Sequence, residues 1–126
     1  MILAKLFGTR KAGDDAEKLA EAYLTRQGLV VVARNYRCRY GEIDLIMRER
    51  ETLVFIEVRL RKPLRGTADF GGALASITTS KQAKLIATAQ HYLAGMKQLP
   101  PCRFDAVLLN GLRTADVEWL RNAFDA

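Results

Sequence analysis

The feature that most constrains the fold is a pair of short apolar segments, residues 41–48 (GEIDLIMR) and 53–61 (LVFIEVRLR), separated by only four residues. Their aliphatic and β-branched composition, together with so short a connection, predicts a β-hairpin. Side chains alternate across a strand, so each segment has one wholly apolar face. The apolar faces hold Ile43, Leu45 and Met47 in the first segment and Val54, Ile56, Val58 and Leu60 in the second. The opposite faces hold Glu42, Asp44 and Ile46, and Phe55, Glu57, Arg59 and Arg61.

The apolar faces of the two segments must coincide in the core, and this fixes the pairing, because a slip of one residue would turn one strand over. Centring the turn between Arg50 and Glu51 then places Asp44 opposite Glu57. Like charges about 5 Å apart across a hairpin destabilise it. The pattern leaves two interpretations open. A hard divalent cation such as Mg²⁺ lies between the carboxylates, or arginines neutralise both acids on a solvated face of the sheet.

The rest of the chain predicts helices on either side of further strands. Residues 14–27 carry an apolar stripe with helical spacing, Asp14 suits the N-cap, and Gly28 suits a C-terminal stop. The other predicted elements are strands at 29–36, 100–110 and 115–120, a helix at 80–96, and a long loop at 62–79. The order is helix, three strands, helix, two strands, which predicts an α/β or α+β domain over residues 1–126, with a mixed sheet flanked by helices.

Composition and charge narrow the function. The chain has 126 residues and a formal net charge of +6, and eight of its nine cations between residues 34 and 65 are arginines. Arginine is suited to bidentate phosphate contacts, so a polyanionic partner is favoured. No apolar run is long enough to span a membrane, and two distant cysteines predict reduced thiols in a cytoplasmic protein. A single histidine excludes a histidine-rich zinc site, and there is no glycine-rich phosphate loop.

Four motifs give the chain a family resemblance: GEIDLIMR, LVFIEVRLR, SKQAKL and RFDAVLL, in this order. They resemble the YraN family of restriction-endonuclease-like proteins, and the resemblance extends over nearly the whole chain. That family is grouped with the PD-(D/E)XK nucleases and is related in fold to archaeal Holliday-junction resolvases. The resemblance implies an αβββαβ core and hydrolysis of phosphodiester bonds that depends on Mg²⁺ or Mn²⁺.

The resemblance also implies roles for individual residues. Asp44 matches the motif aspartate and Glu57 the motif (D/E), while Arg59 stands where the motif has lysine. Glu17 matches a first-helix glutamate that often completes the metal site, and Lys81 matches a lysine at the start of the second helix. The expected catalytic residues are thus Asp44, Glu57 and Arg59, and the expected metal ligands are Asp44, Glu57 and Glu17. Contacts to nucleic acid are expected from Arg39, Arg59, Arg61, Arg65 and Lys81.

Several of these residues have alternative interpretations. Asp14 and Glu17 have the spacing of a capping box, so Glu17 can be a helix cap and not a ligand. Glu42 is expected to pair with Arg59 across the hairpin. Asp105 is interpreted as structural, and the lone His91 as exposed. Arg59 keeps the charge of a lysine but cannot act as a base.

These alternatives leave the function open. The expected activity is an endonuclease acting on DNA, including branched or junction DNA. The alternatives are a catalytically inactive nucleic-acid-binding protein with the same fold and, third, a protein-interaction module. Whether the protein forms a homodimer is open.

Overall fold

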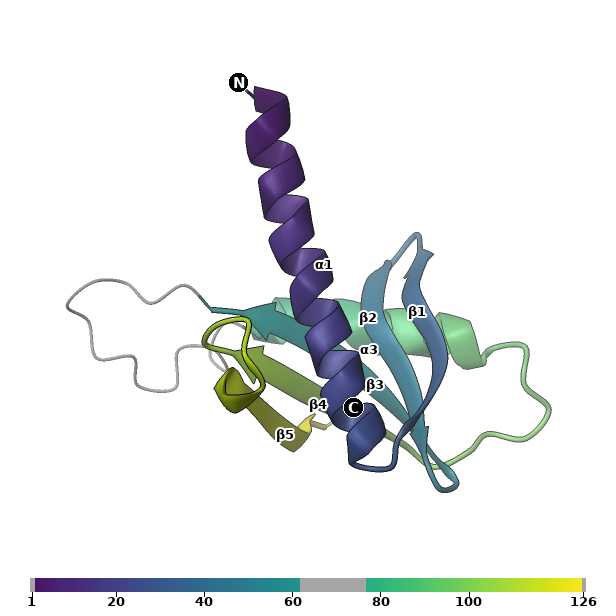
Figure 1. Cartoon of the computed structure of the whole chain (residues 1–126). Coiled ribbons are helices and arrows are strands. Elements are labelled where there is room, and N and C mark those ends of the chain that lie inside the picture. The colour runs from purple at the N-terminus through teal and green to yellow at the C-terminus, as the bar shows by residue number, and fades with distance from the viewer. Residues whose placement is uncertain (1, 62–76, 126) are drawn as a thin grey trace.

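The computed structural model describes residues 2–61 and 77–125 (Figure 1). Its elements follow the expected order of helix, three strands, helix and two strands. They are α1 (Ile2–Arg26), β1 (Val30–Cys38), β2 (Gly41–Glu49), β3 (Thr52–Leu60), α3 (Thr79–Leu93), β4 (Cys102–Leu109), the 3₁₀ turn η1 (Thr114–Asp116) and β5 (Val117–Phe124). The long loop predicted at residues 62–79 falls mostly outside the described residues, and so does Arg65.

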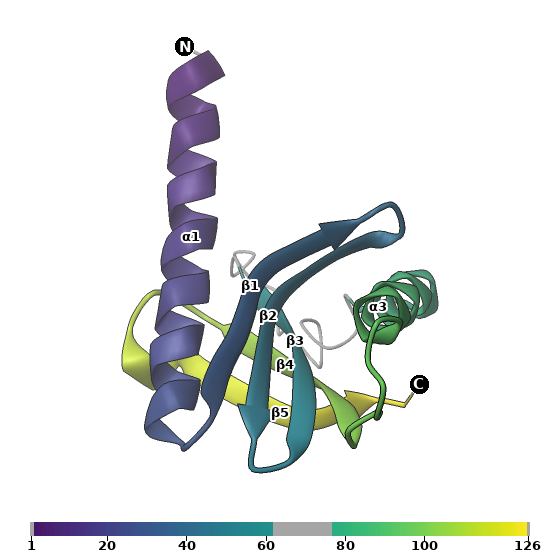
Figure 2. The ribbon, with the colours of Figure 1, turned by 90° about the vertical axis from the view of Figure 1, so that its right-hand side faces the viewer.

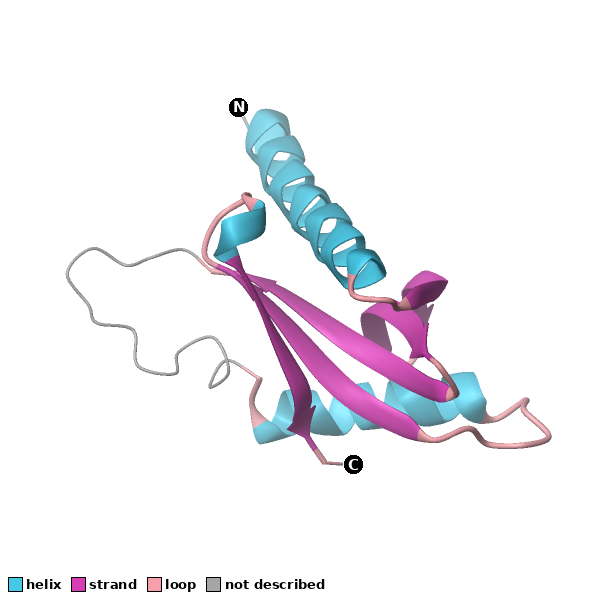
Figure 3. Cartoon of the chain, turned by 60° about the horizontal axis from the view of Figure 1, so that its bottom comes forward, coloured by secondary structure: helices cyan, strands magenta, loops and turns pink. Residues whose placement is uncertain are grey.

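The five strands form a single sheet in the order β1-β2-β3-β4-β5. The first three strands are an antiparallel meander, β3 and β4 run parallel, and β5 returns antiparallel to β4 (Figure 3). Parallel neighbours need a crossover connection, and α3 lies within it. The sheet is therefore mixed and the fold is α+β, as the sequence predicts.

The two helices cover opposite faces of the sheet, α1 on one and α3 on the other (Figure 2). One buried cluster joins α1 to the sheet residues Leu45, Met47, Val54, Ile56, Val107 and Leu109. The other joins α3 to Ile43, Ile46, Phe55, Phe104, Ala106 and Leu108. Both faces of the central strands are buried, so the interpretation that one face of the hairpin is solvated is wrong.

The end of α1 follows from Gly28, as predicted. Gly28 has a φ of +102°, a left-handed conformation that glycine adopts without the steric cost of a side chain. The amide of Leu29 donates to the carbonyl of Leu24 at 3.1 Å, and that of Gly28 to the carbonyl of Thr25 at 3.1 Å. This pair of hydrogen bonds is the Schellman motif, which satisfies carbonyls that the helix end would leave unpaired.

The start of α1 differs from the prediction. The helix begins at Ile2, so Asp14 and Glu17 lie within it. A capping box needs an N-cap residue with non-helical backbone, and Asp14 has helical backbone here. The capping interpretation of these two residues is therefore wrong, and the Glu17 side chain is free to face the sheet.

The register of the β2–β3 hairpin is the predicted one. Residue numbers of paired positions sum to 101, from Glu49–Thr52 to Leu45–Ile56. The turn is made by Arg50 and Glu51, and Arg50 has a φ of +55°. The last pair of the ladder is Leu45–Ile56, one position before Asp44 and Glu57.

The alternation of side chains between the two faces of the sheet is interrupted in β2 at Asp44. The prediction that Ile43 shares a face with Leu45 and Met47 is therefore wrong. Leu45 packs in the α1 cluster as expected, but Ile43 packs in the α3 cluster. The cause lies in β1, where Asn35, across from Asp44, has a φ of +50°. Ala33 and Tyr36 on either side of Asn35 both pack against the α3 cluster, although residues three apart in a regular strand face opposite ways. The β1–β2 hairpin thus turns over at this point, and its tip lies against α3 (Figure 2).

Within the described residues, no helix is both long enough and apolar enough to cross a membrane.

Candidate active site

Asp44 lies where the β2–β3 ladder ends, and beyond this point its carboxylate, in place of a backbone carbonyl of β2, accepts a hydrogen bond from β3. Its Oδ2 accepts a hydrogen bond from the backbone amide of Val58 at 2.8 Å. Burial raises the pKa of Asp44 to about 7, against the opposing effect of the hydrogen bond from the Val58 amide, and the negative charge of Glu17 adds to the rise. A buried carboxyl with so high a pKa binds a proton near neutral pH unless a cation replaces it.

Glu57 lies in β3, two residues beyond Phe55, and is only 8% exposed. Burial raises the pKa of Glu57 to about 7, and the charge of Asp44 acts in the same direction. The two carboxylates therefore repel each other, as the predicted hairpin register implies. Two cations oppose this repulsion: Lys81 Nζ lies 3.3 Å from Glu57 Oε1, and Arg59 Nε lies 3.5 Å from the same oxygen.

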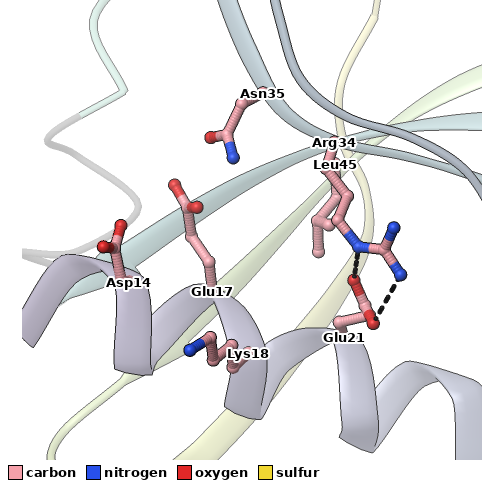
Figure 4. A pocket seen from close by; sticks show the side chains of 7 residues that line it. All are labelled: Asp14, Glu17, Lys18, Glu21, Arg34, Asn35 and Leu45. Atoms are coloured by element: carbon pink, nitrogen blue, oxygen red, sulfur yellow. Dashed lines mark hydrogen bonds and ion pairs between the residues drawn. The ribbon is translucent and has the colours of Figure 1, made fainter. Parts of the chain in front are cut away.

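Glu17 reaches the same place from α1. Burial raises the pKa of Glu17, and its carboxyl interacts directly with that of Asp44. Beside it lies an open pocket between α1 and the β1–β2 hairpin, and in Figure 4 the Glu17 side chain points towards Asn35. The lining residues are Asp14, Glu17, Lys18, Glu21, Arg34, Asn35 and Leu45. On the side away from Asp14, Arg34 is held by both carboxylate oxygens of Glu21, at 2.5 and 3.1 Å (Figure 4).

The two cations beside Glu57 differ in how they are held. Lys81 is in the first turn of α3, where its amide donates to Oγ1 of the N-cap residue Thr78 at 3.2 Å. This bond fixes the start of the helix, and so the position of the lysine. Arg59 is one-third exposed, but its Nε is buried and has no hydrogen-bond acceptor among residues 2–61 and 77–125. A buried donor without an acceptor is costly, and it can bind an anion.

The other predicted nucleic-acid contacts are dispersed. Arg61 Nη1 donates to Asn110 Oδ1 at 3.3 Å, near the end of β4. Arg39 lies at the tip of the β1–β2 hairpin, with its guanidinium on the ring of Tyr40. The predicted pairing of Glu42 with Arg59 is wrong, because Glu42 forms its ion pair with Arg37 at 3.0 Å on the neighbouring strand. The turnover of the β1–β2 hairpin at Asn35 explains this, since it moves Glu42 off the predicted face.

Sequence reasoning missed one polar cluster, which joins the β1–β2 hairpin to α3. His91 is exposed as expected, but its Nδ1 is hydrogen-bonded to the Tyr36 hydroxyl, and its ring contacts that of Tyr40. The signal in the sequence is the run Arg39-Tyr40-Gly41, which has the composition of an exposed turn. Nothing in the local pattern links that run to a histidine 50 residues later.

The raised pKa values predict how stability depends on pH in the metal-free protein. The folded state keeps protons on Asp44 and Glu57 up to a pH of about 7, whereas the unfolded chain loses them near 4. Between these values the folded state binds more protons, so the free energy of unfolding falls as pH rises. We expect a loss on the order of 2–4 kcal/mol between pH 5 and pH 8, measured by urea unfolding in EDTA.

The matched control for this pH dependence is Asp44→Asn, which removes one titrating group and its repulsion of Glu57. The variant should lose less stability over the same pH interval than the wild-type protein. Equal slopes in the two proteins would contradict the assignment of these pKa values.

Comparison with known proteins identifies the family. Residues 16–109 match the family model described as "Uncharacterised protein family UPF0102". The chain is 59% identical over 113 residues to a UPF0102 protein of Nitrosomonas europaea, covering 90% of this chain and 92% of the relative. It is 57% identical over 116 residues to one of Nitrosospira multiformis, covering 92% and 94%. It is also 58% identical over 118 residues to one of Cupriavidus metallidurans, covering 93% and 83%. The matched segment contains Glu17, Asp44, Glu57, Arg59 and Lys81, and the chain therefore belongs to the UPF0102 family, the YraN family that its motifs resemble.

Proposed function

We propose that this protein is a metal-dependent endonuclease that hydrolyses phosphodiester bonds in DNA, with branched or junction DNA as its substrate. The observation that carries the proposal is the meeting of three carboxyl groups, from α1, β2 and β3, beside two cations. Carboxylates with raised pKa values that face one another in a partly enclosed place are typical of a functional site. The YraN resemblance supports the same assignment.

The donor chemistry fits Mg²⁺ or Mn²⁺. Both cations prefer oxygen ligands, and Mg²⁺ is commonly held by one or two carboxylates that share it with water and phosphate oxygens. Among the described residues no group of three or more acidic, histidine or cysteine side chains is already arranged around a common metal position. Asp44 and Glu57 would therefore hold the ion together with substrate oxygens. Glu17 would either orient the Asp44 carboxylate or bind the ion directly as an additional ligand. The bound metal would polarise the phosphoryl group and supply an activated water.

The protein's own cations would bind and orient the scissile phosphate. The Nε donor of Arg59 has no acceptor within the part of the chain that the structure describes, and its guanidinium offers the planar fork that suits phosphate oxygens. Arg59 cannot accept or release a proton, so it contributes positive charge only. Lys81 is held within 3.3 Å of Glu57 and can both contact phosphate and orient the attacking water. We assign Lys81 the role that the motif lysine has in the nuclease superfamily.

One observation favours the alternative, a protein that binds nucleic acid without cleaving it. Lys81 and Arg59 lie 3.3 and 3.5 Å from the same Glu57 oxygen, so the site already holds positive charge next to one expected ligand. These two cations already neutralise part of the negative charge of the carboxylates, so a metal ion is not required for that purpose. The arginines and the net charge of +6 serve phosphate binding in either case.

The test is cleavage of branched, single-stranded and blunt duplex DNA in EDTA, Mg²⁺ or Mn²⁺, with Asp44→Ala as the control variant. The proposal expects products only with metal and only from the wild-type protein. DNA binding without metal-dependent cleavage would replace the proposal by the binding-only alternative. Cleavage that persists in Asp44→Ala would indicate a contaminating nuclease.

A further inference from the structure

Aromatic and basic side chains gather where the tip of the β1–β2 hairpin meets the C-terminal half of α3. This hairpin-tip cluster consists of Tyr36, Arg39, Tyr40 and His91. The Arg39 guanidinium lies 4.8 Å from the centroid of the Tyr40 ring, and its Nη2 donates to the Tyr40 hydroxyl at 2.7 Å. The His91 ring meets Tyr40 edge-on with centroids 6.0 Å apart, and His91 Nδ1 is bonded to the Tyr36 hydroxyl at 2.5 Å. The Tyr40 ring is thus held in one orientation, although it is at the surface.

The tip is also fixed by its backbone. Gly41 has a φ of +151°, and a Cβ atom there would lie 3.2 Å from Thr88 Oγ1 and 3.8 Å from Lys84 Cβ. The missing side chain lets the hairpin lie directly on α3 (Figure 2). Tyr40 nevertheless remains 42% exposed, so the aromatic surface is oriented by its neighbours and still open to solvent. A rigid, exposed aromatic ring beside a guanidinium is suited to bind a ligand that has a flat aromatic group and a negative charge close to it.

Helix α3 links the hairpin-tip cluster to the candidate active site. Lys81 in its first turn is beside Glu57, and His91 near its end is beside Tyr40. The two residues are ten positions apart, which is about 15 Å along the helix axis and matches the rise of about four stacked nucleotides of one strand. Lys84 is exposed along the same helix between these two ends. A nucleic-acid strand can therefore be bound at the hairpin tip and at the carboxylates at the same time.

We propose that the hairpin-tip cluster is a stacking platform for an unpaired strand of nucleic acid, and that Tyr40 stacks on a base about four nucleotides from the bond at the carboxylates. The inference rests on the proposed function for the position of that bond, but the stacking itself does not require cleavage. Tyr40 stacks against the base, Arg39 backs the ring and contacts phosphate, and His91 holds the ring edge. A base within a duplex has both faces covered by its neighbours, so only an unpaired or frayed strand offers a free face.

The experiment measures binding by fluorescence anisotropy in EDTA, where no metal-dependent cleavage occurs, at one fixed salt concentration. The probes are labelled oligothymidylate, oligouridylate and a blunt duplex, each of about 20 nucleotides per strand, longer than a site of 4–16 nucleotides. Wild-type protein should bind at least one unpaired probe more tightly than the duplex. Tyr40→Leu should weaken that binding by about 5-fold or more, and leave duplex affinity within about 2-fold.

Tyr40→Phe is the matched control, because it keeps the stacking ring and loses only the hydrogen bond from Arg39, and it should bind within about 2-fold of the wild-type protein. If thermal unfolding shows that Tyr40→Leu is not folded, Arg39→Lys decides the outcome. That variant keeps the charge but loses the planar guanidinium, and it should weaken unpaired binding with an unchanged salt dependence. Equal affinity of wild-type protein and Tyr40→Leu, or preference of the wild type for the blunt duplex, would overturn the inference. Absence of cleavage with Tyr40-dependent binding would overturn the proposed function alone.

Discussion

Replacing Lys81 by methionine is expected to lower kcat for DNA cleavage by about 100-fold or more, with a smaller change in KM. Methionine keeps the length and apolar stem of the lysine but removes the ammonium, which lies 3.3 Å from Glu57 Oε1. Without it the attacking water loses an orienting donor, and the transition state loses a positive charge. The measurement is single-turnover cleavage at saturating metal, repeated across pH for the wild-type protein and the variant. A catalytic role should change the shape of the pH profile, which a purely structural role would not.

Three further variants sharpen the assignment of Lys81. Arg59→Lys should retain activity within about 10-fold, because the charge at that position is preserved. Lys81→Arg keeps the positive charge and should restore substrate binding, but its larger planar guanidinium should restore kcat only in part. Lys97→Met, an exposed lysine beyond the end of α3, should have no effect and serves as the matched control. Full activity in Lys81→Met, combined with a large gain in Arg59→Lys, would move the lysine role to position 59 and contradict our assignment.

The sequence predicts the β2–β3 hairpin well because parity and turn length act together. The apolar faces of the two strands must lie on the same side of the sheet, which excludes every register that is shifted by one residue. The short connection then selects one of the remaining registers, and the pairing of Leu45 with Ile56 follows. It is the same register that brings Asp44 near Glu57. The geometry of the turn itself does not follow, since an arginine at a φ of +55° carries no distinctive signal.

The errors arise where distant segments decide the outcome. Ile43 changes face because Asn35 has a left-handed backbone, and that choice depends on how β1 bends over α3. Glu17 was compatible with a capping box because local spacing cannot tell where a helix begins when the preceding residues also adopt helical backbone. Contact between Lys81 and Glu57 joins residues 24 positions apart, through a connection whose path no local pattern fixes. In each case the deciding contact or helix boundary lies outside the short sequence window on which the prediction depends.

Asp105 shows the opposite case, because its structural role can be inferred from its neighbours in sequence. It lies in β4, is 1% exposed, and shares an ion pair with Arg103 at 3.0 Å. The carboxylate also accepts hydrogen bonds from Trp119 Nε1 at 2.9 Å and from the Asn122 amide at 3.0 Å. The β4–β5 pairing is irregular at this position, and Asn122 has a φ of +51°. Asp105 thus satisfies an amide that the sheet ladder leaves free, and it holds β5 as the outer strand.

Asp105→Ala should lower the free energy of unfolding by about 3–5 kcal/mol, because it removes a buried acceptor and leaves the half-buried Arg103 guanidinium and two further donors without it. Native domains have only about 5–15 kcal/mol in total, so this single change threatens folding at 37 °C. The measurement is urea unfolding at pH 7, with Trp119→Phe as the comparison, which removes one of the donors and should cost about 1 kcal/mol. Arg103 keeps its ion pair with Glu49 at 2.8 Å in both variants, so the difference between them reports on the carboxylate itself. A loss below about 1 kcal/mol in Asp105→Ala would contradict the structural assignment, because a buried carboxylate with these partners cannot be removed at so small a cost.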